Sequence, residues 1–183
     1  MLNLKDMEFL LACKMRCEKL YIGILNPLGG YQTADKIDLA SPFSYRERLE
    51  MLHEALREFG VKEEEYEIVP FYRDDRLEAF MPKDAIYFLP KGAGGKKEAD
   101  KLSALGQRVE ILDSGSLEER NFVATEVRNL IVRRQSYEDA IPKSTARYIG
   151  QNGLDDMIVA TYEETFKKMK EMKRKERKSI LED

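Results

Sequence analysis

Short runs of apolar residues alternate along the first two thirds of the chain with longer stretches in which apolar residues recur at helical spacing. Runs of the first kind predict strands buried on both faces, and stretches of the second kind predict amphipathic helices. The predicted strands are residues 20–25, 66–69, 85–89 and 109–112. The predicted helices are residues 7–20, 44–59, 96–105, 125–134, 142–149 and 154–180, with a short turn at 137–141.

The connections between these strands are too long for hairpins, which predicts an α/β fold with a Rossmann-like parallel sheet and helices on both faces. Ligands of such sheets bind beyond the carboxyl ends of the strands. The loops after Leu25, Leu89 and Leu112 therefore form a candidate rim, and Asn26 is a candidate nucleotide-binding residue on it. We expect residues 1–150 to form the α/β domain and residues 151–183 a C-terminal amphipathic helix with a basic tail.

The stretch around Thr125 has the pattern of a helix start. Thr125 is a plausible N-cap, and Val127 and Ile131 lie on the apolar stripe that follows it. Free backbone N–H groups near Ala124, the helix dipole and the guanidinium of Arg128 would then favour an anion, most often phosphate. The alternative interpretation is a capped surface helix that binds nothing.

Composition indicates a soluble globular protein, because 43% of the 183 residues are apolar and 36% are charged. No apolar run approaches the ~20 residues that span a bilayer, and no signal-peptide pattern is present. Cys13 and Cys17 are expected to be reduced core residues, which fits a cytoplasmic protein. The net charge of −3 makes general nucleic-acid binding unlikely. The basic residues 167–178 are either a solvated helix face or a contact for a polyanion.

Three further features were considered as sites. The glycine-rich segment 91–97 does not match the Walker A pattern, because Pro90 stands where the first glycine is needed and Lys97 where Ser or Thr is needed. The segment is therefore expected to be a flexible surface turn, or a rim loop whose lysines close over a nucleotide. His53, the only histidine, is expected to be packed or half-buried rather than catalytic. One histidine and two cysteines are a poor zinc ligand set, so no metal site is predicted.

Three segments in the right order resemble the nucleotidyltransferase superfamily, and most of all its archaeal-type nicotinamide-mononucleotide adenylyltransferases. Residues 7–27 resemble the first helix and second strand of the family, and residues 41–51 resemble its N-P-[FL]-[ST]-x-x-E-R-x-x-M segment. Residues 122–128 resemble its I-S-[GS]-T-x-[VI]-R signature, and residues 141–144 resemble its V-P-K-S segment. The resemblance covers roughly residues 7–150.

The resemblance implies adenylyl transfer from ATP, with Mg²⁺, to a mononucleotide of the nicotinamide-mononucleotide type, with release of pyrophosphate. Enzymes of this kind align phosphates and stabilise charge rather than form covalent intermediates. By resemblance, the backbone at Ala124, the Thr125 hydroxyl and Arg128 would hold the β- and γ-phosphates.

The chain departs from the family at its beginning. The family opens with a strand and an H-x-G-H motif at the start of the first helix, whereas Asn3 and Asp6 occupy the histidine positions here, with Lys5 as a possible substitute charge. The alternative is therefore a catalytically degenerate member that binds a nucleotide or a protein partner without turnover. The usual first strand has no residues to form it, so we expect an open sheet edge that a second copy, the tail or residues upstream of Met1 would complete.

Overall fold

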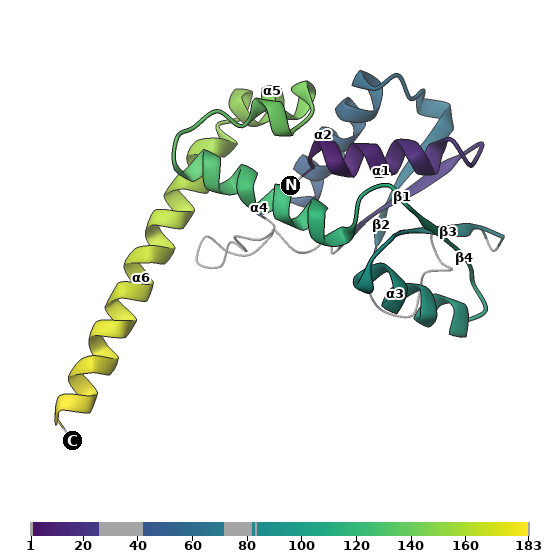
Figure 1. Cartoon of the computed structure of the whole chain (residues 1–183). Coiled ribbons are helices and arrows are strands. Elements are labelled where there is room, and N and C mark those ends of the chain that lie inside the picture. The colour runs from purple at the N-terminus through teal and green to yellow at the C-terminus, as the bar shows by residue number, and fades with distance from the viewer. Residues whose placement is uncertain (1, 26–41, 72–81, 83, 183) are drawn as a thin grey trace.

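The computed structural model describes residues 2–25, 42–71, 82 and 84–182, with side chains described up to residue 167 and at Glu171 (Figure 1). The helices are α1 (Leu4–Lys14), α2 (Tyr45–Glu58), α3 (Ala93–Ala104), α4 (Leu117–Val132), α5 (Lys143–Gln151) and α6 (Leu154–Glu182). The strands are β1 (Leu20–Leu25), β2 (Tyr66–Phe71), β3 (Ile86–Pro90) and β4 (Arg108–Leu112). Short 3₁₀ turns lie at Glu63–Glu65 and Glu138–Ala140. The predicted alternation of strands and helices is confirmed.

The four strands form two separate parallel pairs. β1 pairs with β2, with Leu20 opposite Tyr66, and β3 pairs with β4, with Ile86 opposite Arg108. The predicted parallel α/β architecture is therefore confirmed, but the single continuous sheet is not, because no described strand joins β1 to β3. Completion of the sheet by a second copy stays a prediction.

Helix starts follow short capping sequences. Ser44 caps α2 in the predicted box, in which its hydroxyl accepts the Glu47 N–H and the Glu47 carboxylate accepts the Ser44 N–H. Asn3 and Asp6 form an equivalent box at the start of α1. α1 therefore begins three residues before the predicted start at Met7, because an Asn-x-x-Asp box can cap a helix before its apolar stripe begins.

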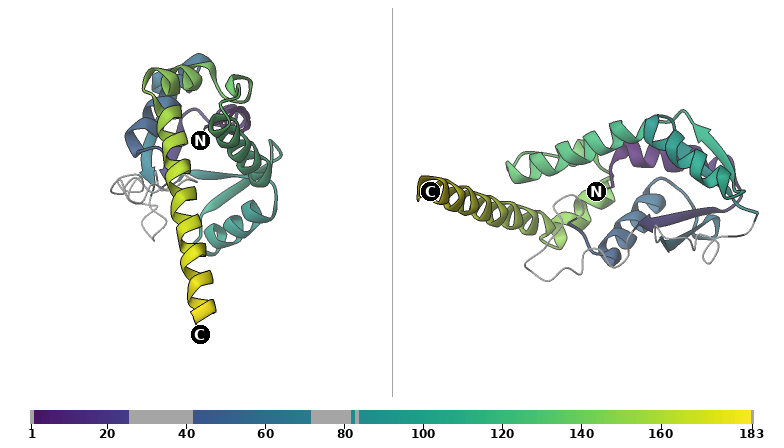
Figure 2. Two further views of the ribbon diagram at one scale, coloured as in Figure 1. Left: turned by 90° about the vertical axis from the view of Figure 1, so that its left-hand side faces the viewer. Right: turned by 90° about the horizontal axis from the view of Figure 1, so that it is seen from below.

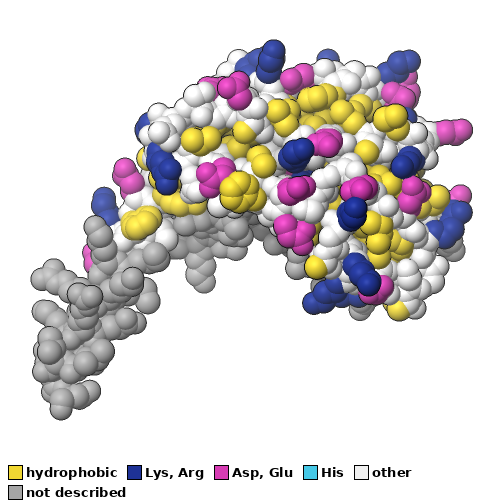
Figure 3. Space-filling model, in the orientation of Figure 1, with side chains coloured by type: hydrophobic (Ala, Val, Ile, Leu, Met, Phe, Trp, Pro, Cys, Tyr) yellow, Lys and Arg dark blue, Asp and Glu magenta, His cyan; other side chains and the backbone are white. Residues whose placement is uncertain are grey.

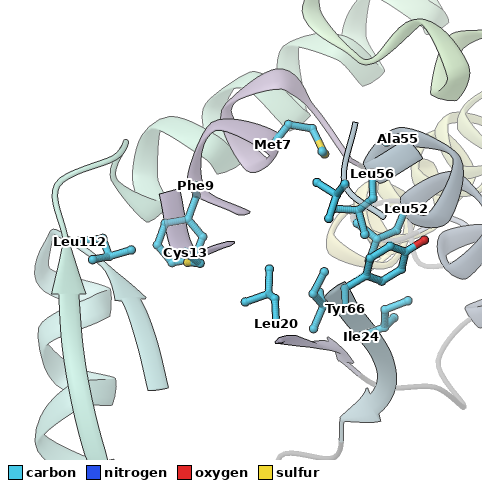
Figure 4. Packing of buried hydrophobic residues seen from close by; sticks show 12 residues of the cluster. Met7, Phe9, Cys13, Leu20, Ile24, Leu52, Ala55, Leu56, Tyr66 and Leu112 are labelled. Carbon is cyan, nitrogen blue, oxygen red and sulfur yellow. The ribbon is translucent and has the colours of Figure 1, made fainter. Parts of the chain in front are cut away.

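Two hydrophobic clusters both include side chains of α2, with Leu52 and Leu56 in the first and Met51 in the second. The first joins α1, β1, α2 and β2 around Met7, Leu20 and Leu56, with Leu112 of β4 at its margin (Figure 4). The second joins α4, α5 and α6 around Ile131, Ile149 and Ile158. Each fully buried aliphatic side chain contributes roughly 1.5–3 kcal/mol relative to exposure, so packing in both clusters stabilises the position of α2.

α6 packs on α4 and α5 at its beginning and then extends away from the rest of the molecule (Figures 1 and 2). Leu154, Ile158 and Val159 of its first turns are buried, whereas Phe166 is 58% exposed. No described helix is long and apolar enough to cross a membrane. The described basic and acidic side chains intermingle on the face drawn in Figure 3, without a broad patch of one sign.

Candidate functional site

The helices α1, α3 and α4 begin beside one another at the carboxyl ends of the strands (Figure 1). The Asn3 side-chain amide of α1 donates to the Arg120 carbonyl in the first turn of α4, at 3.2 Å. A Cβ placed on Gly92, the N-cap of α3, would lie 2.8 Å from a Glu118 carboxylate oxygen of α4. The positive ends of three helix dipoles therefore converge, which favours an anionic ligand.

The start of α3 is the only one of these three without a side-chain cap. Segment 91–97, predicted as a surface turn or a rim loop, instead places Ala93, Gly94 and Gly95 in the first turn of a helix. Gly95 is required there, because a Cβ would lie 1.7 Å from the Pro90 carbonyl oxygen. Lys96 follows with an exposed side chain. This start therefore offers uncapped N–H groups and a cation on the rim that sequence reasoning had predicted.

The start of α1 is closed by its own residues. Asn3 is fully buried, and its side-chain oxygen accepts the N–H groups of Lys5 and Asp6. Burial raises the pKa of Asp6, and this rise is partly offset by the hydrogen bond from the Asn3 N–H and by Arg120, whose guanidinium lies 3.7 Å away. Asn3 and Asp6 thus cap α1. The Arg120 guanidinium lies over the Phe9 ring at 4.7 Å.

Lys5, the possible substitute charge, lies on the rim with a half-exposed side chain. Its ammonium is 2.8 Å from the Glu8 carboxylate, which raises its pKa through the hydrogen bond and the charge. The side chain also approaches the loop between β4 and α4, where its Cδ lies 4.0 Å from the position of a Cβ on Gly115. The Lys5 ammonium could therefore contact an anion at this loop if its ion pair with Glu8 breaks.

The predicted helix start at Thr125 is wrong. α4 begins at Leu117, and Ser116 is its N-cap in a capping box with Glu119. Ala124 and Thr125 lie inside the helix, so their N–H groups belong to its own hydrogen-bond ladder and are not free for an anion. The Thr125 hydroxyl donates to the Asn121 carbonyl at 2.9 Å. The Ser-x-x-Glu box was visible in the sequence and is the stronger start signal.

Arg128 is largely buried on α4, with 9% of its surface exposed. Its guanidinium donates to the Thr125 hydroxyl at 3.0 Å, and the neighbouring Val127 packs in the second hydrophobic cluster. Thr125 and Arg128 therefore lie together, but two turns or more along α4 from its own start. Asn26, the remaining predicted nucleotide-binding residue, lies outside the described residues.

Sequence reasoning missed two arginines of the rim. Arg48 of α2 donates to the Leu25 carbonyl at 2.6 Å and so brings a guanidinium to the carboxyl end of β1. Arg120 joins α1 to α4 as described above, and its buried Nε has no hydrogen-bond partner among the described residues. Arg48 could have been identified as a candidate site residue, because it belongs to the Glu-Arg pair of the family-like segment 41–51. No local sequence pattern identifies Arg120 as a rim residue.

His53 is half-buried, as predicted, and lies away from the rim. Its Nδ1 is 2.6 Å from the Tyr66 hydroxyl at the amino end of β2, and the two rings meet edge to face. Both residues line a cleft of about 720 Å³ between α2, β2 and α5. Among the described residues, no group of three or more His, Cys, Asp or Glu side chains has the geometry of a metal site.

Comparison with known proteins links the chain to a family, although no family model matches it. It is 33% identical over 168 residues to phosphonoformate cytidylyltransferase of Streptomyces viridochromogenes, covering 87% of this chain and 90% of that protein. It is 28% identical over 155 residues to nicotinamide-nucleotide adenylyltransferase of Pyrococcus furiosus, covering 80% and 74%. The enzyme of the same name from Thermococcus sibiricus is 29% identical over 154 residues, covering 80% and 75%.

A solved structure supports the same fold. The bifunctional NMN adenylyltransferase/ADP ribose pyrophosphatase from Francisella tularensis superposes with a TM-score of 0.57 at 12% identity, over 91% of this chain. The chain spans about half of that protein, 52%, so this likeness concerns the fold alone. Together with the identity over nine tenths of the cytidylyltransferase, these findings show that the chain belongs to the nucleotidyltransferase superfamily.

Proposed function

We propose that the protein transfers a nucleotidyl group from a nucleoside triphosphate to a phosphate or phosphonate acceptor and releases pyrophosphate. An acceptor oxygen attacks the α-phosphorus, and the bond to the bridging oxygen of the pyrophosphate breaks. The observation that carries the proposal is the 33% identity to a cytidylyltransferase over 90% of its length. The convergence of three helix starts at the rim supports it, since this chemistry needs stabilisation of phosphate charge.

The β- and γ-phosphates would bind at the start of α3, where the N–H groups lack a side-chain cap and the Lys96 side chain is exposed. The dipoles of α1 and α4 would add to the same positive potential, at roughly 0.3–1 kcal/mol for each helix start. Thr125 and Arg128, which the family signature implies, are the second candidates for this contact.

The nucleotide is either ATP or CTP. ATP is implied by the segments that resemble adenylyltransferases, with a nicotinamide-mononucleotide-type acceptor, and CTP is implied by the name of the cytidylyltransferase relative. Mg²⁺ would arrive with the triphosphate, because the described residues contain no cluster of ligands for it and Mg²⁺ commonly relies on substrate phosphates. In that position it would shield the charge of the departing pyrophosphate.

A second candidate function is nucleotide binding without turnover. The observation that favours it is that Asn3 is fully buried and caps α1, at a position where the resemblance implies a phosphate-binding histidine. Asp6 adds a carboxylate beside the same helix start. Loss of one preorganised donor costs ~10²–10³ in rate, so loss of two would leave little catalysis.

Pyrophosphate release, measured with each of ATP and CTP plus Mg²⁺ and with phosphonoformate or nicotinamide mononucleotide as acceptor, tests the proposal. We expect release with one donor and acceptor pair, whereas calorimetric binding without release would select the second candidate. Lys96→Ala should weaken triphosphate binding about tenfold, which corresponds to about 1.4 kcal/mol, and Lys101→Ala in the last turn of α3 is the matched control. Arg128→Ala tests the alternative phosphate contact in the same assay. No binding of either triphosphate at millimolar concentration would refute both functions.

A further inference from the structure

The long helix α6 leaves the body of the molecule after its first turns (Figure 1). Leu154 and Ile158 are buried in the second hydrophobic cluster, and Tyr162 packs against the same cluster. Phe166 follows one turn later on the same side of the helix, but it is 58% exposed. The apolar stripe that anchors α6 to α4 and α5 therefore continues onto the exposed part of the helix.

The sequence extends this stripe along the outer half of α6. Met169, Met172 and Ile180 follow Phe166 at helical spacing, and α6 continues past all three positions. The stripe is about 20 Å long at a rise of 1.5 Å per residue. The oppositely charged pair Lys173 and Glu176 interrupts it. An apolar stripe of this length that leaves the core indicates contact with an apolar partner.

The other positions of the outer half are strongly basic. Residues 167–178 contain eight Lys or Arg and two Glu, which gives a net charge of +6. Lys167, Lys170, Arg174 and Lys178 recur at helical spacing on the side of the helix away from the stripe. Apolar residues on one side and Lys and Arg on the other are typical of a helix that lies in the surface of an anionic membrane.

Two other partners would match only half of this pattern. A second copy of α6 could cover the apolar stripe, but it would bring two segments of +6 together, which the repulsion of like charges opposes. A nucleic acid would neutralise the basic residues and leave the apolar stripe in water. An anionic lipid surface matches both halves, because its headgroups attract Lys and Arg and its acyl chains accept apolar residues.

We propose that the outer half of α6, residues 166–180, binds an anionic lipid surface. In the bound state the helix lies in the plane of the headgroups, with the apolar stripe toward the acyl chains, and it does not cross the bilayer. The contact uses the end of α6 that points away from the body (Figure 2). It is therefore separate from the proposed nucleotide site and does not depend on nucleotidyl transfer.

Co-sedimentation of the full chain with lipid vesicles tests this proposal. We expect roughly tenfold stronger binding to phosphatidylcholine vesicles that contain about 30% phosphatidylserine than to phosphatidylcholine alone, and loss of this difference at about 0.5 M NaCl. Phe166→Glu should weaken binding to the anionic vesicles roughly fivefold, because it places a carboxylate in the stripe. Phe122→Glu is the matched control, since Phe122 is 67% exposed but lies on α4, and its variant should bind within about twofold of the parent.

A pair of double variants separates the position of the charges from the total charge. Arg174→Glu with Lys178→Glu reverses two charges of α6, and Lys97→Glu with Lys101→Glu reverses two charges of α3. Only the α6 variant should lose binding to the anionic vesicles, by roughly tenfold. Equal losses in the two double variants, equal losses in the two phenylalanine variants, or equal binding to both kinds of vesicle would overturn the proposal.

Two further measurements identify the other partners. Binding of a fluorescein-labelled single-stranded oligonucleotide that Phe166→Glu leaves unchanged, without binding to vesicles, would replace the lipid surface with a nucleic acid. A dimer in sedimentation without vesicles that Phe166→Glu dissociates and Phe122→Glu does not would replace the lipid surface with a second copy of the chain.

Discussion

Replacement of Asn3 by alanine tests whether this residue, the N-cap of α1, stabilises the fold. The Asn3 side chain accepts two N–H groups at the start of α1, at 2.9 and 3.1 Å, and donates to the Arg120 carbonyl at 3.2 Å. Loss of an N-cap costs about 1 kcal/mol, and loss of a buried hydrogen bond costs about 1 kcal/mol more. Asn3→Ala should therefore lower the free energy of unfolding by about 2 kcal/mol, with a fall in Tm of roughly 4–8 °C for a domain of this size.

Urea denaturation followed by circular dichroism measures this change, with two variants for comparison. Asn3→Ser retains a capping hydroxyl but loses the donor to Arg120, so it should cost about 1 kcal/mol. Asn129→Ala removes an exposed contact to Glu126 within α4 and should change stability by less than about 0.5 kcal/mol. A decrease of less than about 0.5 kcal/mol in the free energy of unfolding of Asn3→Ala would refute the structural role. Asn3 would then again be a candidate functional residue.

Three further predictions concern other parts of the molecule. Burial raises the pKa of Cys13 to about 12, so iodoacetamide at pH 8 should modify Cys17 first and Cys13 only after unfolding. Because the Cys13 thiol of the unfolded chain has a pKa near 9.0, the protonated thiol stabilises the fold below pH 9, and this stabilisation is lost as the pH rises from 9 to about 12. Burial alone would raise the pKa of Glu58, but hydrogen bonds from the first residues of α5 outweigh it and hold the pKa below 4.5. Glu58→Gln should cost roughly 0.5–1 kcal/mol in urea denaturation at pH 7, and the difference should disappear as the pH falls through the lowered pKa, because both side chains are then neutral. Gly95→Ala should cost more than about 2 kcal/mol, since its Cβ meets a backbone carbonyl at the end of β3, whereas Gly150→Ala, with open space around it, should be neutral or stabilising; equal thermal midpoints for these two variants would contradict the close approach.

Most of the helices and strands could be predicted from residue patterns, because such patterns depend on neighbours along the chain. The apolar run 20–25 is β1 over its whole length, and the box of Ser44 and Glu47 marks the start of α2. Parallel pairing also followed from the length of the connections, since short links would have been needed for hairpins. Family segments then pointed to nucleotidyl transfer, and the similarity to a cytidylyltransferase supports that class of reaction.

Local patterns were insufficient where two of them competed. Thr125 and Ser116 are both acceptable N-caps, and the structure shows that α4 starts at Ser116 and continues through Thr125. Asn3 was placed by resemblance at a histidine position, and the structure shows it as the buried N-cap of α1, with its side-chain amide bonded to Arg120. The start of α4 follows from a local capping box, whereas the placement of Asn3 depends on a contact with Arg120, 117 positions along the chain, which no periodicity records.

The way in which the elements meet could be seen only in the folded chain. The starts of α1 and α4 are joined by the bond from Asn3 to Arg120, and the strands form two separate pairs with a groove lined by β1 and β3. Each strand pair is stabilised by its own hydrogen bonds and by apolar residues that the sequence displays. The space between the pairs is set by packing of α1 and α2 against them, and packing distances are a property of the folded chain rather than of its local patterns.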